Sequence, residues 1–188
     1  SVIQRGVYIM VFSSLIFLFL FLVLNLTIYL CVKDKYKNIV LLVFSLIFYA
    51  WGGPKYLLLL VGETFASWFF ALRIEKTEND RGRKLYMAGE CVVLLGLLGY
   101  FKYAVFFLEN FQMLFGVPEV IPNIVLPIGI SFYTFQLLSY VVDVYRGEIH
   151  AQPAFWKLLL YSSLFHQCIA GPIVRYETVA NEIDNRKV

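Results

Sequence analysis

The chain has 188 residues, of which 60% are hydrophobic and 18% aromatic, and its formal net charge is +3. This composition excludes an ordinary soluble domain, which is about 45–50% apolar, and no basic tract indicates nucleic-acid binding. Residues 6–32 and 120–142 carry no charged side chain. Because a helix needs about 20 apolar residues to cross a bilayer core, the sequence predicts an integral membrane protein.

Six apolar segments follow one another along the chain. The first is far longer than the apolar region of a signal peptide, about 7–15 residues, and it reads as a retained span. No internal repeat divides the chain, so we expect an all-α, polytopic transmembrane helical bundle of about five to six segments, some broken or re-entrant. The segments are 8–32, 38–51, 56–72, 85–108, 127–144 and 158–174.

The loops between these segments alternate in positive charge. The loops at 33–37, 73–84 and 146–157 carry three, five and two Lys or Arg residues, whereas the intervening loops carry one or none. Since cytoplasmic loops are enriched in Lys and Arg, the N-terminus is expected outside and the three basic loops in the cytoplasm. The basic tail that begins at Arg175 would then lie outside, unless the sixth segment does not cross the membrane completely.

Two apolar segments are interrupted by Pro and Gly. Pro127 and Gly129 lie at the start of the fifth segment, and Gly171-Pro172 lies at the end of the sixth. A broken helix at membrane depth is tolerated only where it is buried in protein or lines a water-filled cavity. The two breaks therefore predict a polar passage, although each could also be a kink that serves packing.

The fifth segment carries a polar stripe. Gln136, Tyr140 and Asp143 share one helix face by their spacing, and Arg146 follows one turn later. Because lipid cannot satisfy polar groups, this face must contact protein or water. It could line the polar passage, or it could form interhelical hydrogen bonds of about 0.6 kcal/mol each. Asp143 and Arg146 could also form a salt bridge at the cytoplasmic end.

A few other polar residues lie within apolar segments. Glu63, at the middle of the third segment, is either functional or a paired or protonated structural residue. Glu90 and Lys102 lie closer to segment ends and can extend to the interface. His166 could act as a general base or as a packing residue, and no metal site is predicted. The three cysteines are expected to be buried small hydrophobic residues: Cys31, Cys91 and Cys168.

Five blocks, in a constant order, are similar to the membrane-bound O-acyltransferase (MBOAT) family, in its alginate O-acetylase-like bacterial branch. The most telling block is "LPIGISFYTFQLLSYVVDVYRGEI", and it contains the polar stripe. The similarity runs from Met10 nearly to the end of the chain. The blocks are residues 10–22, 48–60, 98–107, 126–149 and 169–177.

The resemblance implies a multi-pass enzyme of the bacterial cytoplasmic membrane. It would move an acetyl group from a cytoplasmic donor, acetyl-CoA, to an extracytoplasmic polysaccharide, as in alginate O-acetylation, or to an acyl-accepting partner protein. Family members are a ring of helices around a thinned centre, with a funnel from each face. The expected funnel-lining residues are Gln136, Tyr140, Asp143, Arg146, Gly171, Pro172 and Arg175.

The resemblance also implies that no catalytic residue can be assigned here. The family's catalytic histidine lies in the C-terminal half of a longer chain, beyond Val188, and His166 stands where the family has proline. We expect residues 1–9 to be an upstream extension or fragment boundary, and 10–188 to be the N-terminal part of one transmembrane domain that is inactive alone. The alternatives are a transporter or flippase subunit and a membrane scaffold without chemistry.

Overall fold

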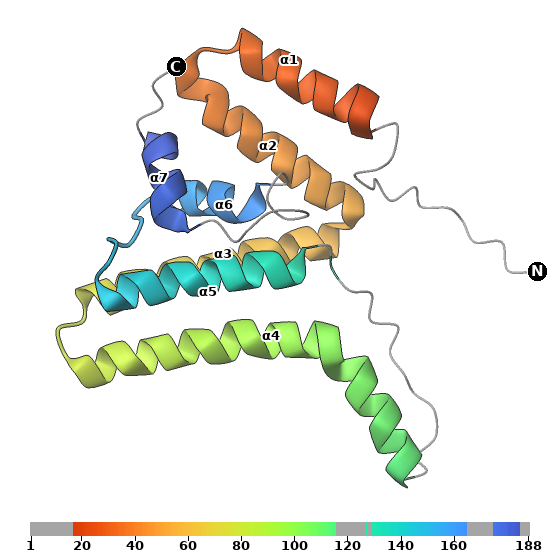
Figure 1. Ribbon diagram of the computed structural model, residues 1–188, viewed down its shortest axis with the longest axis vertical. Coiled ribbons are helices and arrows are strands. Elements are labelled where there is room, and N and C mark those ends of the chain that lie inside the picture. Colours follow the sequence, from red (N-terminus) through yellow and green to blue (C-terminus); the bar gives the residue numbers. More distant parts are fainter. Residues whose placement is uncertain (1–16, 116–126, 128, 165–174, 185–188) are drawn as a thin grey trace, which may run out of the picture.

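The computed structural model describes residues 17–115, 127, 129–164 and 175–184 (Figure 1). The described residues form helices and no strand, which confirms the all-α prediction. A six-residue π-helical turn, Phe17–Leu22, precedes the first α-helix. The α-helices are α1 (Val23–Cys31), α2 (Asp34–Gly52), α3 (Pro54–Lys76), α4 (Asp80–Phe115), α5 (Ile130–Arg146), α6 (Phe155–Ser163) and α7 (Tyr176–Asp184).

Two helices are longer than the apolar segments that predicted them, because charged residues at their ends are compatible with a helix. Lys76 lies in the last turn of α3 and Asp80 in the first turn of α4. Each charge is favourable there, since the helix dipole is negative at the C-terminus and positive at the N-terminus. The predicted polar loop at 73–84 is therefore reduced to residues 77–79.

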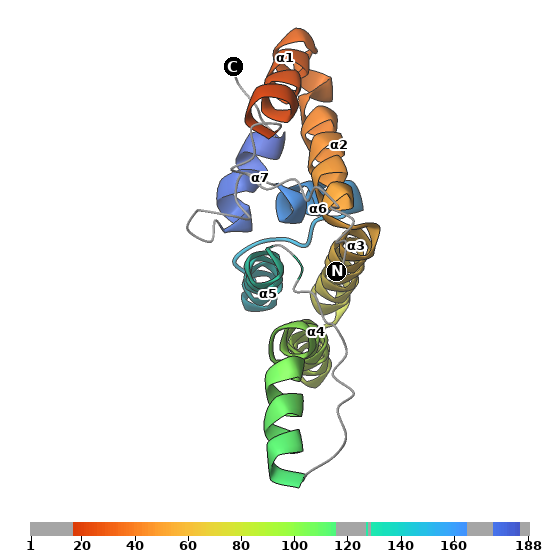
Figure 2. The same cartoon turned by 90° about the vertical axis from the view of Figure 1, so that its right-hand side faces the viewer.

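Helices α3, α4 and α5 form the centre of the molecule and, seen nearly end on, make a triangle (Figure 2). Their contacts are made by apolar side chains with no exposed surface, among them Leu60 of α3, Leu94 of α4 and Leu137 of α5. Helices α1 and α2 form a hairpin on the other side of α3 (Figure 1). Helix α3 thereby contacts α2, α4, α5 and α6.

Two of the described helices are long and apolar enough to cross a membrane, Pro54–Lys76 and Asp80–Ala104. A shorter apolar helix spans Phe19–Cys31. The predicted count of five to six segments is therefore not confirmed. In the part of the sixth segment that the structure describes, α6 has nine residues and a length of about 14 Å, less than half of a bilayer core of about 30 Å.

The basic loops come to the same side of the molecule. The α1–α2 junction, the α3–α4 turn and the α5–α6 connection all lie at the left of Figure 1, whereas the α2–α3 junction and the start of α5 lie at the right. Two contacts join the α3–α4 turn to the α5–α6 connection. Arg83 Nη2 of α4 donates a hydrogen bond of 2.6 Å to the Tyr145 carbonyl of α5, and His150 Nδ1 lies 2.8 Å from Glu75 Oε1 at the end of α3.

Gly147 ends α5 in the left-handed conformation, with a φ of 75°. Its N–H donates to the Val144 carbonyl and the Glu148 N–H donates to the Asp143 carbonyl, at 3.1 and 3.0 Å. This arrangement satisfies carbonyls of the last turn that the helix itself leaves without donors. It also turns the chain sharply, so that Glu148 faces back toward α5.

We predict that Gly147→Val lowers the free energy of unfolding by about 1–2 kcal/mol, because a left-handed residue with a Cβ is disfavoured by that amount. A Cβ at this position would meet no atom within 4 Å, so the cost is conformational. Gly147→Asn should cost less, since Asn adopts this conformation more readily. Thermal unfolding in detergent measures both variants, and equal losses would contradict the explanation.

Candidate functional site

The polar stripe of α5 faces the protein interior. Gln136, Tyr140 and Asp143 are all buried, with at most 5% of their surface exposed. Gln136 Nε2 donates a hydrogen bond of 3.2 Å to the Tyr161 carbonyl, which joins α5 to α6. The expectation that this face contacts protein or water rather than lipid is met, and at Gln136 the contact is an interhelical hydrogen bond.

Gln152, in the α5–α6 connection, joins this connection to two helices. Its backbone N–H donates to the Tyr140 hydroxyl of α5 at 2.8 Å. Its side-chain Nε2 donates to the Tyr176 hydroxyl of α7 at 2.7 Å, and its Oε1 accepts from the Ala154 N–H at 3.1 Å. Gln152 is only 8% exposed, and these contacts fix the loop that leads into α6.

Three tyrosine rings pack together behind Gln152. The Tyr176 ring lies between the rings of Tyr140 and Tyr161, with centroid distances of 5.0 and 5.1 Å. Both contacts are edge-to-face, the geometry that aromatic pairs prefer. Helices α5, α6 and α7 each supply one ring, so this tyrosine cluster of Tyr140, Tyr161 and Tyr176 holds the three helices together.

An open cleft of about 530 Å³ lies in front of the tyrosine cluster. Its walls come from the α5–α6 connection, the start of α6 and the first turns of α7. Lys157 contributes an ammonium group and His150 an imidazole, and Glu148 and Glu177 contribute carboxylates. The lining residues are Glu148, Ile149, His150, Ala151, Gln152, Pro153, Lys157, Tyr176, Glu177 and Ala180.

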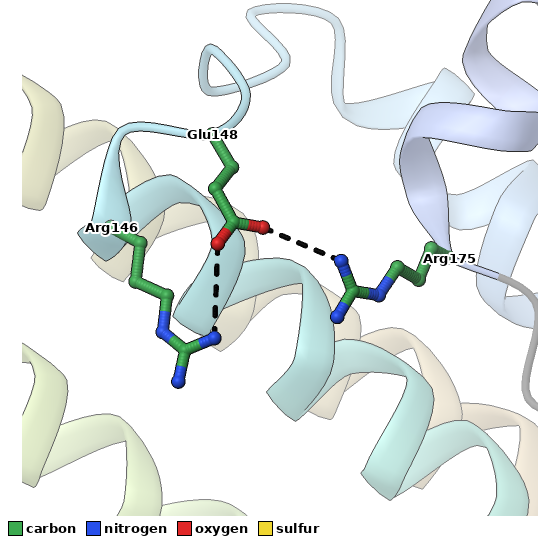
Figure 3. Close-up of polar contacts among 3 residues, drawn as sticks. All are labelled: Arg146, Glu148 and Arg175. Carbon is green, nitrogen blue, oxygen red and sulfur yellow. Dashed lines mark hydrogen bonds and ion pairs between the residues drawn. The ribbon is translucent and has the colours of Figure 1, made fainter.

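Two arginines share one carboxylate beside this cleft (Figure 3). Glu148 Oε1 lies 3.7 Å from Arg146 Nη1, and Glu148 Oε2 lies 3.4 Å from Arg175 Nη1. Arg146 therefore pairs with Glu148, and the salt bridge considered between Arg146 and Asp143 is not formed. All three side chains are substantially exposed, so these ion pairs add little stability. Their effect is to hold two guanidinium groups near one opening.

The start of α7 lies on the same side of the molecule as the end of α5. The Arg175–Glu148 ion pair and the Tyr176–Gln152 hydrogen bond require this. Arg175 therefore lies on the same side of the molecule as Glu148, in the α5–α6 connection.

The predicted site residues are thereby only partly brought together. None of the predicted residues that the structure describes lines the cleft, but Tyr140 contacts the lining residue Gln152. Arg146 and Arg175 contact the lining residue Glu148, and Gln136 and Asp143 are buried on the same face of α5 as Tyr140. His166, Gly171 and Pro172 lie outside the described residues, as does Cys168. Within the described ranges, no group of three His, Cys, Asp or Glu side chains could hold a metal ion.

Sequence analysis missed Gln152, Glu148 and Tyr176 as members of this site. Gln152 and Glu148 lie in a short polar loop, where their residue types give no signal. Tyr176 lies near the end of an apolar segment, where an aromatic residue is common and gives no signal of its contacts with Gln152 and Tyr140.

Comparison with known proteins connects this chain to bacterial O-acetylases. It is 40% identical over 182 residues to a Pseudomonas aeruginosa protein named probable alginate O-acetylase AlgI, with 94% of this chain covered. The protein of the same name from Pseudomonas putida is 38% identical over 185 residues, also with 94% of this chain covered. The Helicobacter pylori peptidoglycan O-acetyltransferase is 30% identical over 209 residues, with 96% covered.

These matches confirm the resemblance to the alginate O-acetylase-like branch. The chain spans 35%, 38% and 40% of the lengths of these three relatives, respectively. No family model and no solved structure matches it.

Proposed function

Because the chain is 30–40% identical to bacterial O-acetylases over nearly its whole length, we propose that it is part of a membrane-embedded O-acetyltransferase. The donor is acetyl-CoA in the cytoplasm, and the acceptor is an extracytoplasmic polysaccharide or a partner protein that carries the acetyl group onward. The protein lies in the bacterial cytoplasmic membrane, with the three basic loops on the cytoplasmic side. The single observation that carries this proposal is the near-complete alignment.

The cleft near the α5–α7 contact is the proposed site of donor approach. Coenzyme A is an anion with several phosphate groups, and arginine binds phosphate through charge-assisted hydrogen bonds. Lys157 lines the cleft, as do the carboxylates of Glu148 and Glu177. Arg146 and Arg175 lie beside the cleft, since each pairs with Glu148. These three cationic groups are the proposed partners of the donor's phosphates.

Behind the cleft, the polar stripe is proposed to border the route of the thioester toward the membrane centre. Arg175, which contacts Glu148, would then lie on the cytoplasmic side together with the three basic loops. We assign no catalytic base to this chain. In this proposal the base is supplied by the part of the enzyme that the relatives have in addition, and the chain alone does not transfer acetyl groups.

A chimera tests the proposed function. The aligned segment of the Pseudomonas aeruginosa relative is replaced by this chain, and the chimera is expressed in a strain that lacks the relative. We expect acetyl esters on the secreted alginate, measured chemically, whereas the chain expressed alone should give none. If the chimera inserts into the membrane but the alginate carries no acetyl esters, the proposed acetyltransferase function is wrong and a scaffold role is favoured. If the chain alone acetylates alginate, the proposal that the catalytic base lies outside this chain is wrong.

A further inference from the structure

Two buried carboxyl groups lie between the central helices, away from the cleft. Glu63 of α3 is 1% exposed and Glu90 of α4 is 0% exposed. Both lie in the two helices that are long and apolar enough to span a membrane. A carboxyl group at such a position is expensive for the fold, so its surroundings must compensate for the loss of water.

Each carboxyl accepts one hydrogen bond from a hydroxyl group on a neighbouring helix. Thr134 Oγ1 of α5 donates to Glu63 Oε2 at 2.8 Å, and Ser67 Oγ of α3 donates to Glu90 Oε1. Glu63 and Ser67 are four residues apart and share one face of α3. Both carboxyls are therefore attached to one turn of α3, because Glu63 belongs to this turn and Glu90 is hydrogen-bonded to Ser67 in it.

The second oxygen of each carboxyl is buried and has no hydrogen-bond partner. These atoms are Glu63 Oε1 and Glu90 Oε2. In the part of the chain that the structure describes, no Lys, Arg or His side chain forms an ion pair with either group. An ionised carboxylate in this setting would keep its charge with one neutral hydroxyl donor and no counter-ion.

Ionisation of both groups is disfavoured by two effects. Removing a charge from water without a counter-ion costs several kcal/mol, and a buried group without a partner usually neutralises instead. Two carboxylates close to each other also repel, which disfavours charge on the second group once the first is ionised. In the neutral form, the carbonyl oxygen still accepts the hydroxyl hydrogen bond and the other oxygen carries the proton.

We propose that Glu63 and Glu90 are protonated within the membrane and act as positioning residues. As neutral acids they fix α5 and α4 on α3 through Thr134 and Ser67. Thr64, the residue after Glu63, makes a similar contact with α6, since its Oγ1 lies 2.8 Å from Ser162 Oγ. Residues 63–67 of α3 thus set the positions of α4, α5 and α6. The connection between α5 and α6 lines the cleft, so these residues also influence the position of the cleft.

Infrared spectroscopy of the full chain in lipid bilayers tests the protonation. The carbonyl stretch of a protonated carboxylic acid is separate from the bands of a carboxylate. At pH 7.5 we expect this band in the parent protein, a smaller band in Glu63→Gln and in Glu90→Gln, and a further loss in the double variant. Glu75→Gln is the matched control, because the Glu75 carboxyl contacts His150 and neither Glu63 nor Glu90. The carbonyl band of this variant should equal that of the parent protein.

A second pair of variants keeps all carboxyls and changes only the donors. Ser67→Ala and Thr134→Val remove the hydroxyls, so the carbonyl bands of Glu90 and Glu63 should shift to higher frequency. Thermal unfolding adds a structural readout, in which the Gln variants unfold near the parent temperature and Glu63→Leu and Glu90→Leu unfold well below it. A band that is absent, or that is unchanged in both Gln variants, overturns the proposal. None of these readouts depends on acetyl transfer.

Discussion

Tyr140→Ala should be among the most destabilising single substitutions in this chain. The Tyr140 ring has no exposed surface and packs 5.0 Å from the Tyr176 ring, and truncation of a buried aromatic residue to Ala costs about 3–5 kcal/mol. The change also removes the acceptor of the Gln152 N–H, which adds about 1–3 kcal/mol for a buried donor without a partner. Helix α7 should then detach from α5 and α6.

Thermal unfolding in detergent measures this loss, and Tyr140→Phe separates its two causes. Phe keeps the ring contacts with Tyr176 and loses only the acceptor, so we expect about 1–3 kcal/mol. Protease cleavage after residue 175 reports the detachment of α7, and it should rise strongly in Tyr140→Ala and little in Tyr140→Phe. If the two variants were equally stable, the tyrosine cluster would not hold the helices together.

The second large effect is expected on donor binding. In the chimera, Arg146→Gln combined with Arg175→Gln should raise the KM for acetyl-CoA about tenfold to hundredfold, with a smaller change in kcat. A hydrogen bond to a charged group contributes about 1.5–3 kcal/mol, and about 1.4 kcal/mol corresponds to a factor of ten. The expected change therefore corresponds to the net loss of one such hydrogen bond from the two exposed guanidinium groups. Initial rates of acetyl transfer in membrane vesicles, measured over a range of acetyl-CoA concentrations, give both constants.

Two variants control for charge and for position. Arg146→Lys combined with Arg175→Lys keeps both positive charges and the Glu148 carboxylate, so the KM should rise less than in the double Gln variant. Lys76→Gln removes a positive charge in the last turn of α3, at a residue that is outside the cleft lining and, unlike the two arginines, forms no ion pair with Glu148. It should leave the KM near the parent value. An unchanged KM in the double arginine variant would mean that the donor does not use this cleft.

The sequence predicted the helices well where long apolar runs determine them. The run that became α3 and the polar stripe of α5 were both located, because burial in lipid or protein requires apolar or periodic residues. Helix ends were less accurate, since Arg73, Lys76 and Asp80 were interpreted as loop residues although their charges suit helix termini. This error also made Glu90 appear close to a segment end, when it lies ten residues inside α4 and is completely buried.

The cleft could not be predicted in the same way. It depends on a loop, 147–154, whose position is set by hydrogen bonds of Gln152 to Tyr140 and Tyr176. These residues are separated by 12 and 24 positions in the chain, and no periodicity connects them. The position of Arg175 depends in turn on where the sixth segment ends, which its hydropathy alone left open between a full crossing and a return.

Site-directed labelling tests the central claim, that the cleft faces the cytoplasm and receives the donor. His150 lines the cleft, and its side chain is almost fully exposed. His150→Cys is placed in the chimera, with the three native cysteines of this chain replaced by Ala, and labelled with a membrane-impermeant maleimide. Lys55→Cys, at the α2–α3 junction on the opposite side, is the matched control.

We predict that the maleimide labels His150→Cys in inside-out vesicles only and that acetyl-CoA slows this labelling. Lys55→Cys should be labelled in right-side-out vesicles only, and acetyl-CoA should not change its rate. Labelling of His150→Cys from the extracytoplasmic side would contradict the account, as would labelling at an unchanged rate in saturating acetyl-CoA.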